Sequence, residues 1–242
     1  MRNKTNLLVV PGWHSVLNLL KPDALMTIDH ILVSQTVGKD KIRQLDTHTY
    51  ELVEKSVLDK LSDHHQGVVA MAVPKSFLLE DIRQPLLDHN GLVIVLDEVQ
   101  DPHNLGACMR LAAASGACAV IIPKRNSVGY TPVVQKVASG ATAVVPMITV
   151  ANITRALQTL QGWGVWSYGF SEHTDDSLYD AKLNETPVAM VFGSEGNGIR
   201  RLTRETCDHL LTIPTQPALP SLNIATACAV GVFEWVRQRG LE

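Results

Sequence analysis

From residue 92 onward the sequence alternates short, unbroken apolar runs with segments of helical spacing, and this alternation constrains the fold more than any other feature. The apolar runs are LVIVL (92–96), ACAVII (117–122), AVVPMI (143–148), GVWSYGF (164–170), VAMVF (188–192) and HLLTI (209–213). The helical segments are 104–115, 131–139, 151–161, 198–207 and 223–239. Strands that are apolar on both faces are typical of a parallel sheet covered by helices on both sides. The sequence therefore predicts an α/β domain with a parallel sheet over residues 91–242.

The first 75 residues predict a smaller α/β domain. Its expected elements, read from apolar spacing, are a short helix after Gly12, a strand at 28–34, a helix at 49–61 and a strand at 68–73 that Pro74 ends. Residues 76–90 carry charges, Pro85 and an Asn-Gly pair, which are typical of a linker. We therefore expect a domain at 1–75, a linker at 76–90 and a second domain at 91–242.

Composition excludes several classes of protein. The chain is 45% hydrophobic with a formal net charge of −3, which is typical of a globular protein and gives no overall basic footprint for nucleic acid. No apolar run reaches the roughly 18 residues of a membrane span, and the stretch before Pro11 is too short for a secretory signal. We therefore expect a cytoplasmic protein without a membrane segment. Any RNA contact would come from a local cluster such as Arg200, Arg201 and Arg204, a pattern that is also typical of a solvated helix face.

The cysteines indicate thiols and no metal site. Cys108, Cys118, Cys207 and Cys228 show no CxxC spacing and lie in apolar or helical stretches. Buried, reduced thiols are favoured over disulfides or a zinc site.

The loops that follow the predicted strands carry the polar residues, and ligands of parallel sheets bind at these strand ends. In the first loop Asn104 is placed to cap a helix. Arg110 is the only charged residue between 105 and 123, so we expect it to be buried on an apolar helix with an anionic partner. An ion pair within the fold is the alternative to a substrate contact.

The second and third loops add a glycine-rich turn and a polar helix start. Residues 193–198 read GSEGNG, in which Glu195 is the sole charge and a candidate partner for Arg110. The sequence contains neither GxxxxGK[ST] nor GxGxxG, which argues against a P-loop protein and against a nucleotide-dependent dehydrogenase. In the third loop, 213–223, Ser221 and Asn223 could equally be caps of the last helix.

Together the three loops resemble the three signature motifs of the SpoU (TrmH) family of RNA methyltransferases. The matching segments, in order and over nearly all of 91–242, are DPHNLGACMRLAAASG, VFGSEGNGIRRLTRETCD and IPTQPALPSLNIATACAVGVFEWVRQR. With GWHSVLNLL and HQGVVAMAVP, the whole chain is similar to members that methylate a guanosine of 23S ribosomal RNA. The resemblance implies an S-adenosylmethionine-dependent ribose 2′-O-methyltransferase, a deep trefoil knot in the C-terminal parallel sheet, a homodimer, and an N-terminal domain that resembles ribosomal proteins and helps to bind RNA.

The resemblance also implies the site residues. Those matching the catalytic positions are Asn104, Arg110, Glu195, Ser221 and Asn223, and those expected to touch the cofactor are Gly193, Ser194, Gly196, Ile213 and Leu222. Because a guanidinium normally keeps its proton, we expect Arg110 to hold the target phosphate and the emerging alkoxide, not to act as a base.

Four residues depart from the family pattern, namely Ala113, Ala143, Pro217 and Pro220, and the N-terminal domain is about a dozen residues short between 43 and 50. None removes a catalytic position, but they leave the RNA target open. Two alternatives remain: a methyltransferase for tRNA or another rRNA site, and a catalytically silent RNA-binding protein of ribosome assembly.

Overall fold

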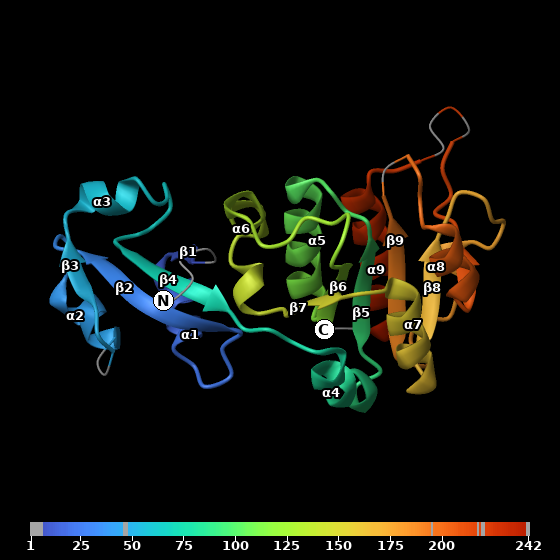
Figure 1. Ribbon diagram of the computed structural model, residues 1–242, viewed down its shortest axis with the longest axis horizontal. Coiled ribbons are helices and arrows are strands. Elements are labelled where there is room, and N and C mark those ends of the chain that lie inside the picture. The colour runs from blue at the N-terminus through green and yellow to red at the C-terminus, as the bar shows by residue number, and fades with distance from the viewer. Residues whose placement is uncertain (1–6, 46–47, 195, 217, 219–220, 241–242) are drawn as a thin grey trace. The chain divides into compact units, whose positions relative to one another are not determined.

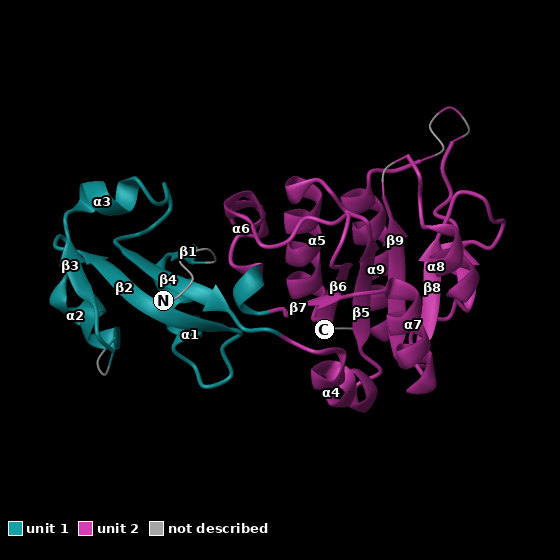
Figure 2. Cartoon of the chain, viewed as in Figure 1, with its two compact units in different colours: residues 1–76, 142–144 teal, residues 77–141, 145–242 magenta. Residues whose placement is uncertain are grey.

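The computed structural model describes residues 7–45, 48–194, 196–216, 218 and 221–240. The chain divides into two compact units, one of residues 1–76 and 142–144 and the other of residues 77–141 and 145–242 (Figure 2). None of the helices in the described ranges is long and apolar enough to cross a membrane.

The smaller unit is built on a mixed sheet. In it β4 lies between β1 and β2 and runs antiparallel to both, while β3 is parallel to β2. Its elements are β1 (Leu8–Pro11), α1 (Trp13–Leu19), β2 (Met26–Ser34), α2 (Lys39–Ile42), η1 (Arg43–Leu45), β3 (Glu51–Val53), α3 (Lys55–Asp59) and β4 (Val68–Pro74). The predicted first helix and both predicted strands of this unit are confirmed.

The predicted helix at 49–61 is wrong in its first half. Residues Glu51–Val53 form β3, which pairs in parallel with β2 so that Leu32 faces Glu51. Only Lys55–Asp59 are helical, with Leu58 buried. Pairing with an open sheet edge has overridden the local helical spacing, because strand formation depends on the neighbouring strand more than on intrinsic preference.

The larger unit alternates strands and helices as expected (Figure 1). Its elements are η2 (Leu79–Ile82), α4 (Arg83–Asp88), β5 (Leu92–Asp97), α5 (Pro102–Ser115), β6 (Ala119–Pro123), α6 (Pro132–Ala138), η3 (Ala141–Ala143, assigned in part to the smaller unit), β7 (Met147–Val150), α7 (Ile153–Gly162), β8 (Trp166–Phe170), η4 (Leu178–Asp180), β9 (Val188–Gly193), α8 (Arg201–Thr206), β10 (His209–Leu211) and α9 (Ile224–Arg239).

The stretch expected to be a linker, 76–90, is instead largely structured. It contains η2 and α4, whose Leu79, Ile82 and Leu86 are buried in the core of the larger unit. The charges and Pro85 that indicated a linker are exposed, while Leu79, Ile82 and Leu86 pack into this core. Apolar burial, and not a flexible connection, therefore defines this segment.

The six strands of the larger unit's sheet, counted in the described residues, lie in the order β10-β8-β9-β5-β6-β7, and every pairing is parallel. Alternate residues of each central strand face opposite cores. On β5, Leu92, Ile94 and Leu96 pack towards α5, α6 and α9, whereas Val93 and Val95 pack towards α4 and α7. This two-sided cover explains the unbroken apolar runs and confirms the predicted α/β class.

The sheet order brings the ends of β8, β9, β5 and β10 to one edge. Asp97, the last residue of β5, lies opposite Gly193, the last residue of β9. Phe170 at the end of β8 stacks on Phe192 with ring centroids 4.4 Å apart. A Cβ on Gly231 of α9 would come within 2.6 Å of the Phe170 ring, so this glycine lets the aromatic pair lie close against α9.

The short edge strand β10 is fixed to β8 by Asp208. Its carboxylate accepts hydrogen bonds from the amide and hydroxyl of Ser167, at 2.8 and 2.6 Å, and from Gln161 at 3.1 Å. Burial opposes ionisation, but the hydrogen bonds from Ser167 and Gln161 outweigh it and lower the pKa of Asp208 below its ordinary 3.8. The ionised carboxylate thus holds β10, and with it the loop that begins at Thr212.

We predict that Asp208→Asn lowers the free energy of unfolding at pH 7 by about 1 kcal/mol, because the site is partly exposed and its charged hydrogen bonds are screened. Because the folded-state pKa is lowered, this stabilisation is present above pH 3.8 and is lost as the pH falls through the folded pKa. Urea unfolding at several pH values measures it. Asp175→Asn, at an exposed carboxylate with no bond to a described residue, is the control. An equal effect of both substitutions would contradict the assignment.

Candidate functional site

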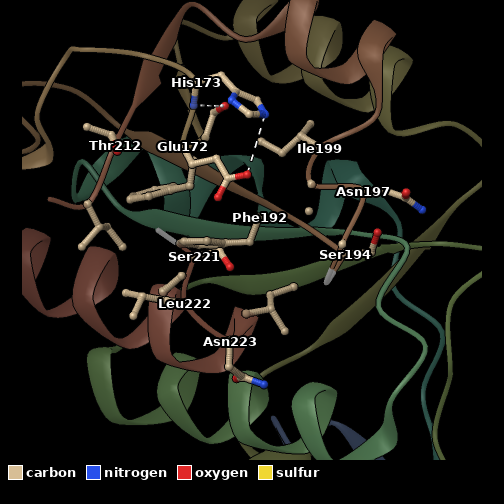
Figure 3. A pocket seen from close by; sticks show the side chains of 18 of the residues that line it. Glu172, His173, Phe192, Ser194, Asn197, Ile199, Thr212, Ser221, Leu222 and Asn223 are labelled. Carbon is tan, nitrogen blue, oxygen red and sulfur yellow. Dashed lines mark hydrogen bonds and ion pairs between the residues drawn. The ribbon is translucent and has the colours of Figure 1, made fainter. Parts of the chain in front are cut away.

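A cavity of about 700 Å³ opens at the carboxyl ends of β8, β9 and β10. Its walls come from the loops after these strands and from the first turn of α9, as Figure 3 shows for Ser194, Thr212 and Ser221. The stacked rings of Phe170 and Phe192 line it. This volume and this mixture of apolar and polar groups are typical of a small-molecule site.

The sequence-predicted residues of the second and third loops meet in this cavity. All five residues expected to touch a cofactor line it, and so do two of the expected catalytic residues: Gly193, Ser194, Gly196, Ile213, Leu222, Ser221 and Asn223. The roles of these residues stay predictions.

The loop after β9 is a tight turn that folds back over Gly193. Ser194 and Gly198 exchange backbone hydrogen bonds of 3.1 and 2.9 Å, and Gly196 and Gly198 have positive φ values of 92° and 62°. A Cβ on Gly193 would fall on the carbonyl carbon of Gly198 and the amide nitrogen of Ile199. Only glycine therefore allows the turn to close against the strand end.

Asn104 and Asn223 join the first and third loops. The side-chain amide of Asn223 donates a 3.1 Å hydrogen bond to the side-chain oxygen of the buried Asn104, and its own oxygen accepts from Ala225 at 2.8 Å. Asn223 is thus a helix cap as well as a site residue. Asn104, expected to cap α5, is not the cap. Asp101 takes that place and accepts from the amide of His103 at 2.9 Å, because the helix already begins at Pro102, before the expected start at 104.

Arg110 does not have the buried position expected from the sequence. It is exposed on the single chain and does not line the cavity. The helical repeat places His103, Ala107, Arg110 and Ala114 on one face of α5, and α6 and α9 pack against the other faces. The small alanines around Arg110 made the helix look apolar all round, although one stripe is uncovered. The expected partner, Glu195, lies outside the described residues.

The arginine cluster proposed for RNA contact is divided among three environments. Arg200 hydrogen bonds to the fully buried Asp97, with Nη2 to Oδ1 at 2.6 Å. Arg201 makes an exposed ion pair with Glu205 at 2.9 Å. Arg204 lines the cavity. The three arginines therefore do not share one environment, although Arg200 and Arg201 are both exposed.

Sequence reasoning missed the loop after β8, which contributes Glu172 and His173 to the cavity. Their side chains are 3.7 Å apart and lie across the cavity from Asn223 (Figure 3). The loop follows a strand, which is the signal that could have found it. It was overlooked because only the sheet order, with β8 next to β9, shows that this strand end belongs to the same site.

A second cavity of about 440 Å³ contains none of the predicted residues. It is lined by Trp166, Tyr168 and His209 with a rim of carboxylates. The 700 Å³ cavity is therefore the candidate site.

The thiols offer no nucleophile to the site. All four cysteines are free, with Cys108 and Cys228 buried and Cys118 and Cys207 half-buried. Burial, followed by the charges of Asp208 and Asp97, raises the pKa of Cys207 to about 12, so it stays a neutral thiol near pH 7.

Comparison with known proteins assigns the fold and motifs to one family. The model of the SpoU rRNA Methylase family matches residues 91–233. The chain belongs to this family. A second model, RNA 2'-O ribose methyltransferase substrate binding, matches residues 9–78. Both units of this SpoU protein thus have counterparts in RNA ribose methyltransferases, and the family resemblance read from the motifs is confirmed.

Curated relatives cover most of the chain. The 23S rRNA (guanosine-2'-O-)-methyltransferase RlmB of Photobacterium profundum is 40% identical over 238 residues, which is 94% of this chain and 96% of the relative. RlmB of Ralstonia nicotianae is 50% identical over 186 residues, 74% of this chain and 72% of the relative.

Solved structures of SpoU proteins share the fold. The SpoU methyltransferase AviRb from Streptomyces viridochromogenes, in complex with AdoMet, matches with a TM-score of 0.81 at 22% identity, over 97% of this chain and 91% of that one. A crystal structure of an RNA 2'-O ribose methyltransferase matches with a TM-score of 0.76 at 25% identity, over 98% and 90% of the two chains.

We predict that Gly193→Ala weakens binding of S-adenosylmethionine by about tenfold or more. The added methyl group must push the 198–199 backbone away, at a cost of about 1–3 kcal/mol, and this deforms the cavity wall. Calorimetric titration measures the affinity. Gly162→Ala is the matched control, because a Cβ there meets nothing within 4 Å. Unchanged affinity in the Gly193 variant would show that the turn is not part of the cofactor site.

Proposed function

We propose that this protein transfers the methyl group of S-adenosylmethionine to the 2′-hydroxyl of a guanosine ribose in 23S ribosomal RNA. One observation carries the proposal. The second and third SpoU motifs meet in a single cavity, and the Asn223–Asn104 hydrogen bond connects the first motif to it. The target RNA and the target nucleotide in this proposal are those named for the RlmB relatives.

The residues of the cavity fit S-adenosylmethionine. The stacked Phe170 and Phe192 with Ile213 and Leu222 offer apolar surface to an adenosyl group. Glu172 and Arg204 offer one acidic and one basic side chain to a ligand that carries both an ammonium and a carboxylate. The cofactor, when bound, supplies an electrophilic methyl group on a sulfonium.

In the mechanism the protein aligns the hydroxyl and stabilises the charge that develops on its oxygen. Arg110 is the cation for the target phosphate and the emerging alkoxide, because a guanidinium donates in a planar fork and keeps its proton. Asn104, Ser221, Asn223 and Glu195 would position the reacting groups. The hydroxyl proton leaves to the RNA phosphate or to water.

The smaller unit would bind the RNA, in keeping with its match to the substrate-binding model. Methylation of ribosomal RNA would place the protein in the cytoplasm. The trefoil knot that the family resemblance implies stays a prediction.

The active form would be a homodimer in which each copy completes the other's site. Arg110 lies six residues beyond Asn104, about 9 Å along α5 and roughly 120° around its axis, and does not line its own chain's cavity. Its stripe of α5 is uncovered, and Phe233 of the neighbouring α9 is 44% exposed. A second copy covering this surface would desolvate Arg110 and bring it to the cavity of the partner.

Ribose-methylation mapping of total RNA with and without the gene tests the proposed function. We predict that deletion removes one methylated guanosine in 23S rRNA and that the wild-type gene restores it. Arg110→Lys should not restore it, because an ammonium cannot reproduce the planar fork. Arg155→Lys, at an exposed arginine of α7, should restore it fully.

The mapping also separates the alternatives. Loss of a methyl group from tRNA or another rRNA site would contradict the target. No change in any ribose methylation, with a defect in ribosome assembly, would indicate a catalytically silent RNA-binding protein. Full restoration by Arg110→Lys would contradict the role given to Arg110.

Mixed dimers test the shared site. Chains carrying Gly193→Ala and chains carrying Arg110→Lys are co-expressed with different tags, and mixed dimers are purified through both tags. We predict that the mixed dimers are active at a cofactor concentration well below the Kd of the Gly193 variant, where each variant alone is nearly inactive. One of the two sites then has an intact cavity and an intact arginine, so about half of the wild-type activity is expected under the shared-site arrangement. Inactive mixed dimers would show that each chain uses its own Arg110.

A further inference from the structure

A buried ion pair holds the far end of the turn that follows β9. The amide of Arg200 donates to Oδ2 of Asp97 at 3.1 Å, and its Nε and Nη2 donate to Oδ1 at 2.9 and 2.6 Å. The Asp97 side chain is fully buried, whereas that of Arg200 is 43% exposed. Arg200 therefore fixes its backbone and its side chain on one carboxylate.

This carboxylate sits beside the start of the same turn. Asp97 faces Gly193 in the β5–β9 register, so the turn leaves the sheet beside Asp97 and returns to it at Arg200. The Ser194–Gly198 hydrogen bonds close the turn in between. Both ends of the segment that walls the cavity are thus fixed at one point of the sheet.

The ion pair also connects to the loop after β6. Glu98, with a positive φ of 67°, lies 3.2 Å from Nη1 of Arg200 and accepts from the side chain of Asn126 at 3.0 Å. Ser127 donates to the Val99 carbonyl at 3.1 Å. Glu98 therefore links Arg200 to the loop after β6, and three strand-end loops are connected at this point.

We propose that Asp97 and Arg200 are positioning residues that hold the 193–199 turn in the shape that binds the methyl donor, and that Arg200 is not an RNA contact. The inference rests on the proposed function. Its physical basis is that Asp97 has no access to water, so its charge depends on the guanidinium, and only a planar fork can donate through two nitrogens to the carboxylate while a third faces Glu98. The hydrogen bond to Asp97 raises the pKa of Arg200, so the guanidinium stays charged at any working pH.

Calorimetric titrations of the full-length protein with S-adenosylmethionine and, separately, with a 23S rRNA transcript test the inference. We expect Arg200→Lys and Asp97→Asn to weaken cofactor binding by about tenfold. RNA binding without cofactor should change by less than about twofold. Because the defect lies in positioning the turn, saturating cofactor should restore most of kcat in Arg200→Lys, so the loss appears in KM.

The matched control is Arg201→Lys, one residue away, whose pair with Glu205 is exposed and which should leave the cofactor affinity unchanged. If Asp97→Asn fails to fold, Glu98→Gln gives a milder form of the test, because Glu98 contacts only the outer nitrogen of Arg200. It should weaken cofactor binding while sparing RNA binding.

The outcomes distinguish a failure of this inference from a failure of the proposed function. Wild-type cofactor affinity in Arg200→Lys and Glu98→Gln would overturn the inference, and so would weakened RNA binding with unchanged cofactor affinity. A wild-type protein that binds no S-adenosylmethionine would instead refute the proposed function itself.

Discussion

The close crossing of two backbone segments at Gly193 is the constraint on which the site depends. The turn after β9 returns across this residue with no room for a Cβ, and Arg200 is then held by Asp97 on the neighbouring strand. The parallel register of β5 and β9 pairs Asp97 directly with Gly193. The cavity wall is therefore a product of the strand ends, and its shape follows from packing that a ligand does not have to induce.

Much of the fold could be predicted because its signals are local. Apolar runs without alternation gave the parallel sheet, and glycines and polar residues after the strands indicated where the cavity lies. Sheet order is not local, so the contribution of Glu172 and His173 after β8 was missed. The strand at Glu51–Val53 was read as helix because its partner, β2, is almost twenty residues away in sequence.

The exposure of Arg110 could not be predicted from the sequence for a different reason. A helix rich in alanine and cysteine gives little contrast between its faces, so its sequence does not reveal which stripe a single chain leaves uncovered. That stripe contains Arg110, the residue to which the proposed mechanism assigns the developing charge. A guanidinium in open water gives weak electrostatic stabilisation, and covering it with a second copy would strengthen it by excluding solvent. Under this arrangement dimerisation and catalysis become one requirement.

Hydrogen exchange of the full-length protein with and without S-adenosylmethionine tests the central claim most directly, because it locates the ligand without any substitution. If the strand-end loops form the cofactor site, the ligand should slow exchange of the amides in 193–199, 212–213 and 222–225 and leave those around Trp166 and 175–186 unchanged. Protection confined to the second cavity, or no protection at these three segments, would contradict the account.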